Sequence, residues 1–218
     1  MVGMARHVDH LVIPVHDLGG TAAALEAAGF VVTPQADHPF GTSNRLVVFG
    51  DTYLELVAIT QPALLPLDGF ADEVRSYLES GEGVSHVVVS CHDPEADFRM
   101  VAAAGIGDGE IFEFSRGAPR ADGSVTQASF SIVRTITTAP LGAFLCAHDV
   151  PDAVWHESHL SHPDGSRRIV GLELPGPAPE VFEVFEVGGV EFGETARVVT
   201  DGSAELVAIG GLVVGGSR

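Results

Sequence analysis

The chain has 218 residues with a hydrophobic fraction of 45%, which is enough to bury a sizeable core as one large domain or two small ones. Thirty Asp and Glu oppose eleven basic residues, all of them Arg, and the formal net charge is -19. This acidity disfavours binding to nucleic acid or to an anionic membrane. The absence of Lys excludes Schiff-base chemistry and a P-loop lysine. Imidazole, present ten times, is therefore the main group for acid–base or metal chemistry.

Cysteine content and hydropathy indicate the compartment. Cys91 and Cys146 are too few for a disulfide framework in a chain of this length. The N-terminal stretch 1–7 has no apolar segment of the kind found in signal peptides, and no later apolar run reaches about 18 residues. We therefore expect a cytoplasmic protein with no membrane partner.

An internal repeat organises the chain. Residues 7–30 align without gaps onto residues 83–106, and eight of the 24 aligned positions are identical. His10 matches His86 in this alignment. Each copy begins with a buried strand and continues as a helix, whose N-cap is Asp17 or Asp93.

Strand patterns follow each predicted helix. In the first copy we expect strands at 30–34, 45–50 and 53–59, and in the second copy at 111–115, 127–135 and 143–148. The fold class is therefore α+β, with paired βαβββ modules forming a cup-shaped mixed sheet and helices outside. The expected units are a first module over 1–60, a connecting helix over 61–82, a second module over 83–150, a connector over 151–166 and a strand-rich extension over 167–218. The extension reads as a degenerate third module.

Strand parity places three polar residues on the concave face of the sheet. Side chains alternate across a strand, so His10 and, through the repeat, His86 point away from the apolar face that packs under the helices. Glu55 shares the concave face in the last strand of the first module, where a buried carboxylate needs a cation or strong donors. Two imidazoles and one carboxylate can hold a divalent ion with open positions for substrate oxygens. The alternative is that both histidines are ordinary core residues.

The last strand of the second module carries Cys146, which we align with Glu55, and His148 on the same face. His148 is open to three interpretations: a ligand, a general base or a buried structural histidine. Cys146 is either part of the cavity lining or a small buried hydrophobe.

Three motifs mark the first and last strands of the modules: VDHLVIPVHDL, YLELV and GVSHVVVSCHD. They resemble the vicinal oxygen chelate superfamily of glyoxalases, bleomycin-resistance proteins, extradiol dioxygenases and epimerases. Three further segments, HPFGTSN, FLCAH and SHPDG, are similar to a glyoxalase-like subgroup, and together the motifs span residues 7–175. The resemblance implies a cup-shaped fold and metal ligands drawn from the first and last strands of each module, which selects His10, Glu55 and His86. Cys146 at the fourth position departs from a four-ligand glyoxalase site.

Other residues are expected at the rim and walls of the cup. His38, Thr42 and Asn44 lie in a loop-to-strand turn, and either bind substrate or only shape the turn. Tyr53 and Phe144 are expected to contact an organic ligand. His38 and His148 are the expected proton-transfer residues.

Three arginines border the long second hairpin: Arg116, Arg120 and Arg134. They either receive a substrate carboxylate or are solvated. His156, His159 and His162 are interpreted as a polar connector.

Two functions fit these expectations. The first is a metal-dependent lyase, isomerase or dioxygenase whose small substrate chelates the ion through adjacent oxygens; the ion can be Fe, Mn, Ni or Zn. The second is a metal-free protein that binds or sequesters a small molecule, in the manner of drug-resistance members of the superfamily. Two modules in one chain can complete a cup, so a monomer and a homodimer are both compatible with the sequence.

Overall fold

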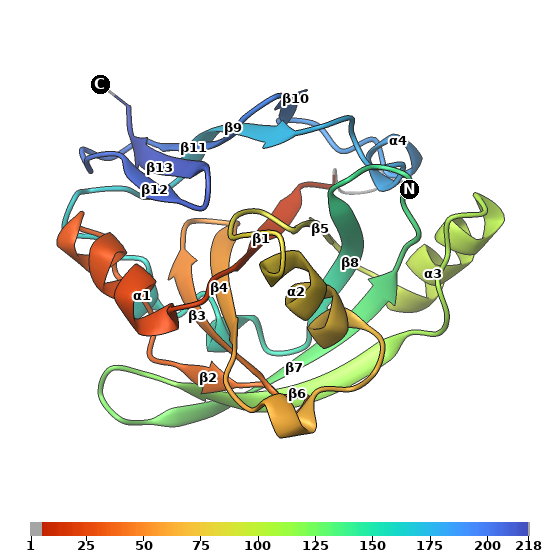
Figure 1. Cartoon of the computed structure of the whole chain (residues 1–218), viewed down its shortest axis with the longest axis horizontal. Coiled ribbons are helices and arrows are strands. Elements are labelled where there is room, and N and C mark those ends of the chain that lie inside the picture. Colours follow the sequence, from red (N-terminus) through yellow and green to blue (C-terminus); the bar gives the residue numbers. More distant parts are fainter. Residues whose placement is uncertain (1–5, 218) are drawn as a thin grey trace.

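The structure is a computed structural model that describes residues 6–217 (Figure 1). The first five residues, part of the N-terminal stretch analysed above, lie outside the described residues. The first module comprises β1 (Val8–Pro14), α1 (Leu18–Ala27), β2 (Ala36–Asp37), β3 (Thr42–Val48) and β4 (Tyr53–Ile59). The second comprises β5 (His86–Ser90), α3 (Pro94–Ala103), β6 (Phe112–Pro119), β7 (Val125–Arg134) and β8 (Gly142–His148). The predicted βαβββ pattern therefore occurs twice.

The two modules form one eight-stranded sheet in the order β2-β3-β4-β1-β5-β8-β7-β6. In each module the first strand pairs with the last in parallel, and the two first strands, β1 and β5, pair antiparallel at the centre. Leu11 lies directly opposite Val87, its own equivalent in the repeat. A pseudo-twofold axis therefore passes between these residues, and the sheet curves until its edge strands β2 and β6 approach each other. The predicted cup-shaped α+β fold is confirmed.

Both repeat helices begin as their sequences predict. Asp17 and Asp93 are the N-caps, and their carboxylates accept hydrogen bonds from the backbone N–H groups of Gly20 and Ala96. Gly105 follows the end of α3 with φ +74°, a left-handed conformation that favours glycine.

One predicted strand is absent. Residues 30–34 form no strand, and the short β2 begins two residues later. Thr33 still exchanges backbone and side-chain hydrogen bonds with Leu46 of β3, but Pro34 has no N–H with which to continue a ladder. The apolar pattern that predicted a strand instead buries Phe30 and Val32 in the core.

The sheet separates two cores. On its convex side, Leu11, Ile13 and Leu54 pack with α1, α3 and the C-terminal region. On its concave side, Val12, Tyr53 and neighbouring residues form a second cluster. The predicted parity is confirmed for β4 and for the part of β1 that follows Asp9, whereas Val8 lies in the convex cluster with Leu11, against simple alternation.

Helix α2 (Phe70–Leu78) connects the modules and covers part of the concave face, where Val74 is fully buried. It lies in front of the sheet in Figure 1. Three short 3-10 helices complete the connecting regions: η1 (Pro62–Leu64), η2 (Pro151–Ala153) and η3 (Glu157–His159). The predicted connecting helix is therefore present, although it is shorter than the segment 61–82.

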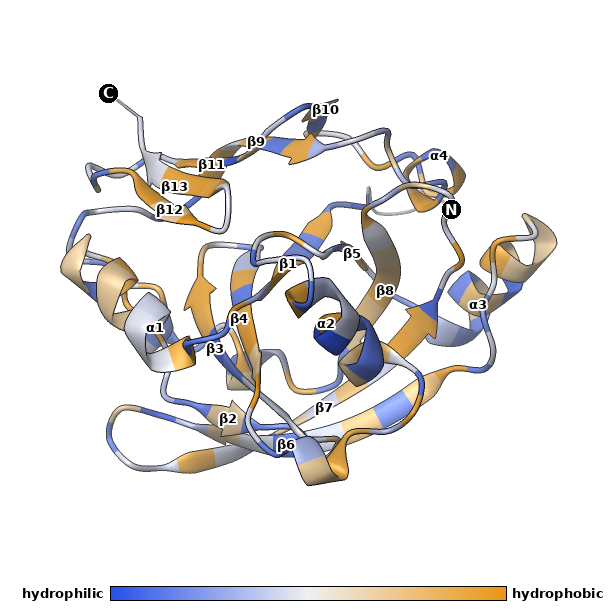
Figure 2. Cartoon of the chain, viewed as in Figure 1, coloured by the Kyte–Doolittle hydropathy of each residue, from blue (hydrophilic) through white to orange (hydrophobic). Residues whose placement is uncertain are grey.

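The C-terminal region forms a separate five-stranded sheet in the order β10-β9-β11-β13-β12. Its elements are β9 (Ile169–Pro175), α4 (Val181–Val184), β10 (Glu191–Gly193), β11 (Ala196–Thr200), β12 (Val207–Ile209) and β13 (Leu212–Gly216). The hydrophobic residues of β11–β13 (Figure 2) pack against the convex core. This strand order differs from that of the modules, and an origin as a degenerate third module stays a prediction.

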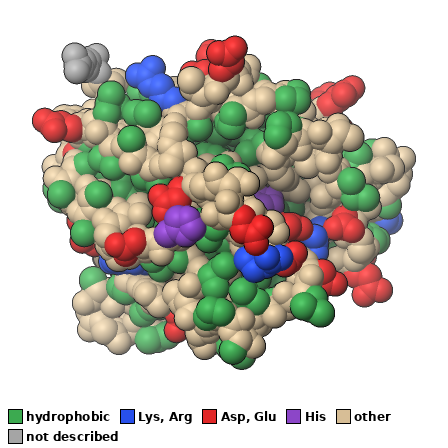
Figure 3. Space-filling view, viewed as in Figure 1, with side chains coloured by type: hydrophobic (Ala, Val, Ile, Leu, Met, Phe, Trp, Pro, Cys, Tyr) green, Lys and Arg blue, Asp and Glu red, His purple; other side chains and the backbone are tan. Residues whose placement is uncertain are grey.

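The charged surface is consistent with solvation. Acidic side chains are scattered over the face shown in Figure 3 and do not gather in one patch. Within residues 6–217 no helix is long and apolar enough to cross a membrane.

Candidate metal centre and active site

A cavity of about 870 Å³ lies on the concave side of the main sheet. Eight of the predicted site residues line it: His10, His38, Asn44, Tyr53, Glu55, His86, Phe144 and Cys146. Thr42 and His148 do not line it but hydrogen-bond to residues close to it. The C-terminal sheet contributes no lining residue among those described, so the cavity is formed by the two modules and the segment that connects them, including α2.

The strand register surrounds one residue with the three predicted metal ligands. Val12 of β1 pairs with Glu55 on one side and with His86 on the other, and His10 is two positions before it on the same face. Adjacent strands are about 4.8 Å apart, so side chains from all three positions can reach the space above Val12. Nε2 of His10 is 3.7 Å from the carboxylate of Glu55, which directly joins two of the three.

The two histidines are held in matching ways. Nδ1 of His10 is 2.6 Å from Oδ1 of Asp9, and Nδ1 of His86 is 2.8 Å from Oγ of Ser85. Asp9 and Ser85 are themselves equivalent in the repeat. The preceding residue thus occupies Nδ1 in each module, and Nε2 of each imidazole is left to face a carboxylate. A metal-ligating histidine is typically oriented by such a partner.

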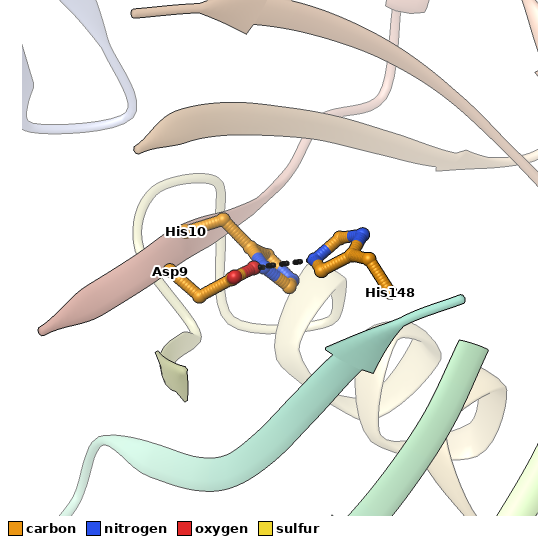
Figure 4. A group of neighbouring side chains, drawn as sticks. All are labelled: Asp9, His10 and His148. Atoms are coloured by element: carbon orange, nitrogen blue, oxygen red, sulfur yellow. Dashed lines mark hydrogen bonds and ion pairs between the residues drawn. The ribbon is translucent and has the colours of Figure 1, made fainter. Parts of the chain in front are cut away.

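Asp9 reaches the concave face because β1 is irregular. The register of the β1–β5 pair shifts between Val8 and His10. Because of this irregularity, the side chains of Asp9 and His10 do not alternate between opposite faces of the sheet as they would in a regular strand. Oδ1 of Asp9 also lies 2.9 Å from Nε2 of His148, at the end of β8 (Figure 4). Burial alone would raise the pKa of Asp9, but His148 and His10 hold it below its usual range.

Asp9, His10 and His148 are the one group of three metal-binding side chains that the described residues bring within 4.8 Å of one another. Their closest atoms, however, are at hydrogen-bond distance. Ligand atoms around a tetrahedral ion with bonds of about 2.0 Å lie about 3.3 Å apart, farther than the 2.6 Å between His10 and Asp9. This cluster is therefore better described as an ionised carboxylate that orients two imidazoles.

His86 is engaged by a carboxylate from the covering helix. Its Nε2 is 3.1 Å from Oε2 of Glu73 in α2, and Oε1 of Glu73 accepts a hydrogen bond from Arg134 at 2.7 Å. The hydrogen bond from His86 is the main reason that the pKa of Glu73 is lowered. Glu73 occupies the Nε2 atom that an ion would need, so an ion bound at His86 would have to displace Glu73. As the side chains lie here, His86 pairs with Glu73 and not with His10 or Glu55.

The turn motif residues form a hydrogen-bonded chain that leads to Glu55. Nδ2 of Asn44 donates to Oε1 of Glu55 at 2.7 Å and lies 3.3 Å from Nε2 of His38. Nδ1 of His38 is 2.8 Å from Oγ1 of Thr42. Burial lowers the pKa of His38 to about 4, so this imidazole is neutral at physiological pH. The motif therefore fixes the carboxylate of Glu55 as well as shaping a turn.

The alignment of Cys146 with Glu55 is wrong. Tyr53 pairs with His10 in the first module, and the equivalent pair in the second is Gly142 with His86. Two positions on, Phe144 rather than Cys146 is the equivalent of Glu55. Matching the aromatic residues Tyr53 and Phe144 gives this incorrect alignment, because the position of β8 is set by its pairing with β5. Burial raises the pKa of the Cys146 thiol well above its usual range. The position equivalent to Glu55 holds the ring of Phe144, which cannot ligate an ion.

Two connector histidines are structural. His162 is buried, with Nδ1 accepting from the N–H of Val31 and Nε2 donating to the carbonyl of Val48. Nδ1 of His159 is 2.8 Å from the carbonyl oxygen of Val154. The connector is therefore polar but partly buried: His162 ties it to the first module, and His159 bonds within the connector itself.

The sequence interpretation missed Asp9, Ser85 and Glu73. A signal for the first two was available, because both repeated histidines follow a polar residue. Glu73 gave no such signal, since it comes from a helix whose position over the cup depends on tertiary packing.

Comparisons with known proteins agree with this fold. The profile of a family described as glyoxalase-like domain matches residues 8–184. The chain belongs to the glyoxalase-like domain family. This confirms the resemblance that the motifs indicated. Among curated proteins, no significant sequence match is found.

Similar solved structures include a hypothetical protein from Staphylococcus aureus, at 12% identity and a TM-score of 0.74, covering 97% of this chain and 99% of that one. A mutant 4-hydroxymandelate synthase from Streptomyces coelicolor has 16% identity and a TM-score of 0.47, covering 97% of this chain and 62% of that one. A methylmalonyl-CoA epimerase from Mycobacterium tuberculosis has 14% identity and a TM-score of 0.41, covering 64% and 85%. The first likeness, which extends over the C-terminal sheet, supports the whole fold.

Proposed function

We propose that this protein is a divalent-metal-dependent enzyme of the isomerase, lyase or dioxygenase type. Its substrate is a small molecule that chelates the ion through two adjacent oxygens, and His10, Glu55 and His86 hold the ion. The observation that carries the proposal is the matched arrangement of the two repeated histidines. Each has Nδ1 occupied by the preceding residue, and Nε2 faces a carboxylate in one cavity.

The residues present fit a divalent ion. Two imidazoles and a carboxylate suit Fe, Mn, Ni or Zn. Glu73 and Asp108 are paired with Arg134, but Glu55 lines the cavity without an arginine ion pair among the described residues, so its charge is available to a cation beside His10. Oδ1 of Asn44 is buried and has no hydrogen-bond partner among the described residues, which leaves an acceptor for a bound substrate.

The bound ion would act as a Lewis acid toward the substrate oxygens or as a redox centre. The chain itself supplies orientation and proton transfer. Asp9 fixes the ring of His10, and Asn44 fixes the carboxylate of Glu55. We propose that neutral His38 moves a proton at Nε2, and that His148 acts through Asp9. Tyr53, whose ring stacks on His10 with centroids 4.3 Å apart, and Phe144 would contact the organic part of the substrate.

The decisive experiment is metal analysis of protein purified without chelator and then loaded with each of the four ions. We expect about one ion per chain in the wild type. Affinity should fall at least about tenfold in His10→Ala and in Glu55→Gln. The control His16→Ala removes an exposed histidine and should bind as the wild type does. Metal uptake that is indifferent to both site substitutions would reject the proposal.

A metal-free binding protein is the second candidate. It is favoured by the pairing of Glu55 with Asn44 and of His86 with Glu73, which satisfies both side chains without an ion. Thermal-shift measurements separate the two candidates. Stabilisation by Mn, Ni, Zn or Fe that is lost in His10→Ala supports the enzyme, and stabilisation only by organic ligands supports the binding protein.

A further inference from the structure

A buried arginine on the cavity wall has no carboxylate within ion-pair distance among the described residues. Arg116 of β6 lines the cavity and is only 7% exposed. Its Nη1 donates to the carbonyl of Gly117 at 3.2 Å, and its Nε is buried without a hydrogen-bond partner among the described residues. The guanidinium carbon lies 5.5 Å from the centre of the Phe130 ring.

The other arginines near this hairpin are paired. Arg134 lines the same cavity and is bound to Glu73 at 2.7 Å and to Asp108 at 3.2 Å. Arg120 lies one residue beyond β6 and is bound to Asp152 at 2.6 Å. Within residues 6–217, no carboxylate oxygen approaches Arg116 to the 4.0 Å of an ion pair. Burial lowers the pKa of Arg116, and Glu55 opposes this only from beyond ion-pair distance. The buried charge is therefore only partly compensated, and a ligand carboxylate on the guanidinium would complete the compensation.

The surroundings of Arg116 are aromatic. Phe114 contacts Phe130 at 5.0 Å and Phe40 at 5.4 Å between ring centres, and Phe112 stacks on Phe114 at 5.6 Å. All four rings line the cavity. They offer an apolar, aromatic surface beside Arg116, the cavity arginine that forms no ion pair among the described residues.

We propose that the cavity binds an aromatic carboxylate, with its carboxylate on Arg116 and its ring against the phenylalanines around Phe114. The free Nε edge of a guanidinium matches a carboxylate in a two-bond geometry. A phosphate dianion fits less well, because Glu55 and Glu73 also line the cavity and repel a second negative charge.

This inference rests on the proposed function in one respect: both place the substrate in the same cavity, and here its chemical class is named. Binding of the carboxylate to Arg116 does not require the metal ion. Binding is therefore measured both with EDTA and with the ion that the metal analysis identifies, so that the two proposals can fail separately.

The probes are 3-phenylpropionate, its neutral amide 3-phenylpropanamide, and inorganic phosphate, measured by isothermal titration calorimetry. We expect the wild type to bind the carboxylate about tenfold more tightly than the amide. Arg116→Gln should reduce this preference to about twofold or less and leave the affinity for the amide unchanged. Arg120→Gln is the matched control and should keep the full preference.

Four results would overturn the proposal: equal affinity for acid and amide, a full preference in Arg116→Gln, competition by phosphate at equal strength, or no saturable binding of the acid up to about 10 mM. If near-UV circular dichroism shows that Arg116→Gln does not fold, Arg116→Lys replaces it. Lys keeps the charge but loses the fork, so the preference should fall at least about threefold, and an unchanged preference rejects the role of Arg116. Loss of metal binding with the preference intact would reject only the metal centre.

Discussion

Asp9 and His10 are neighbours in one strand, yet their side chains meet on the same side of the sheet, with Oδ1 of Asp9 2.6 Å from Nδ1 of His10. The irregular register of β1 at this point makes the contact available. A single carboxylate thereby orients His10 and also holds His148 of the second module. The floor of the cavity is thus coupled to the end of β8 through Asp9.

Substitution of Asp9 by Asn should weaken the site without removing a ligand. Asn keeps the size of Asp but loses the charge that accepts from both imidazoles. We expect metal affinity to fall about 10- to 100-fold and the free energy of unfolding to fall by about 1–3 kcal/mol. Metal titration and denaturant unfolding measure these quantities. Asp51→Asn, in an exposed turn, is the control, and equal metal affinity in Asp9→Asn would contradict an orienting role.

Glu73→Gln tests whether His86 is a ligand. Glu73 occupies Nε2 of His86 at 3.1 Å and competes with an ion for that atom. Removing its charge should weaken the pairing and raise metal affinity several-fold if His86 is a ligand. Glu79→Gln, in the residue that caps the end of the same helix and pairs with Arg75, should leave affinity unchanged. A lower or unchanged affinity in Glu73→Gln would argue against His86.

His38 should make stability depend on pH between about 4 and 6.5. Burial lowers its pKa from 6.5 to about 4 in the folded protein, so in this range the unfolded chain binds a proton that the folded protein does not. Stability therefore rises with pH across the window and is lost on acidification, by up to about 3 kcal/mol. His38→Gln should reduce the difference in unfolding free energy between about pH 4.5 and about pH 7.5, an interval that covers most of the window. An identical pH dependence in His16→Gln and His38→Gln would show that His38 does not contribute.

The repeat and the strand parity predicted most of the fold. The match of His10 with His86 and the alternation in β4 are visible in the sequence alone, and both hold in the structure because the two faces of each strand pack in different cores. The boundaries of β4 were also predicted correctly. Repeated patterns of this kind need no knowledge of tertiary contacts.

Features that depend on strand pairing or on helix packing could not be predicted from the sequence. The equivalence of Phe144 with Glu55 follows from the register of β8 against β5, which the composition of β8 does not reveal. Asp9 was missed because simple parity assigns it to the wrong face. Glu73 reaches His86 only because α2 packs over the concave side, and the unpaired state of Arg116 is visible only once every carboxylate has been placed.

His162→Ala should destabilise the protein without affecting the metal centre. The ring bridges the N–H of Val31 and the carbonyl of Val48, each at 2.8 Å, and its loss leaves two buried backbone groups unpaired. We expect a loss of about 2–4 kcal/mol in denaturant unfolding with metal affinity unchanged. His156→Ala is the control, because that ring bonds only within its own turn, to Ser158. A loss of metal binding in folded His162→Ala would assign this histidine a second role.

Gly142→Ala should displace His86 although it alters no polar group. A methyl group at Gly142 would lie 2.3 Å from the His86 ring, too close for a real contact. In the first module the equivalent position holds Tyr53, whose ring stacks on His10, so the two histidines have different room to move. The expected results are a shifted His86 signal in NMR titration and weaker metal binding. Gly171→Ala is the control: its methyl group would meet Val199 at an ordinary 3.5 Å, and it should change neither quantity. If folded Gly142→Ala binds metal as tightly as the wild type, the position of His86 is not what sets the affinity.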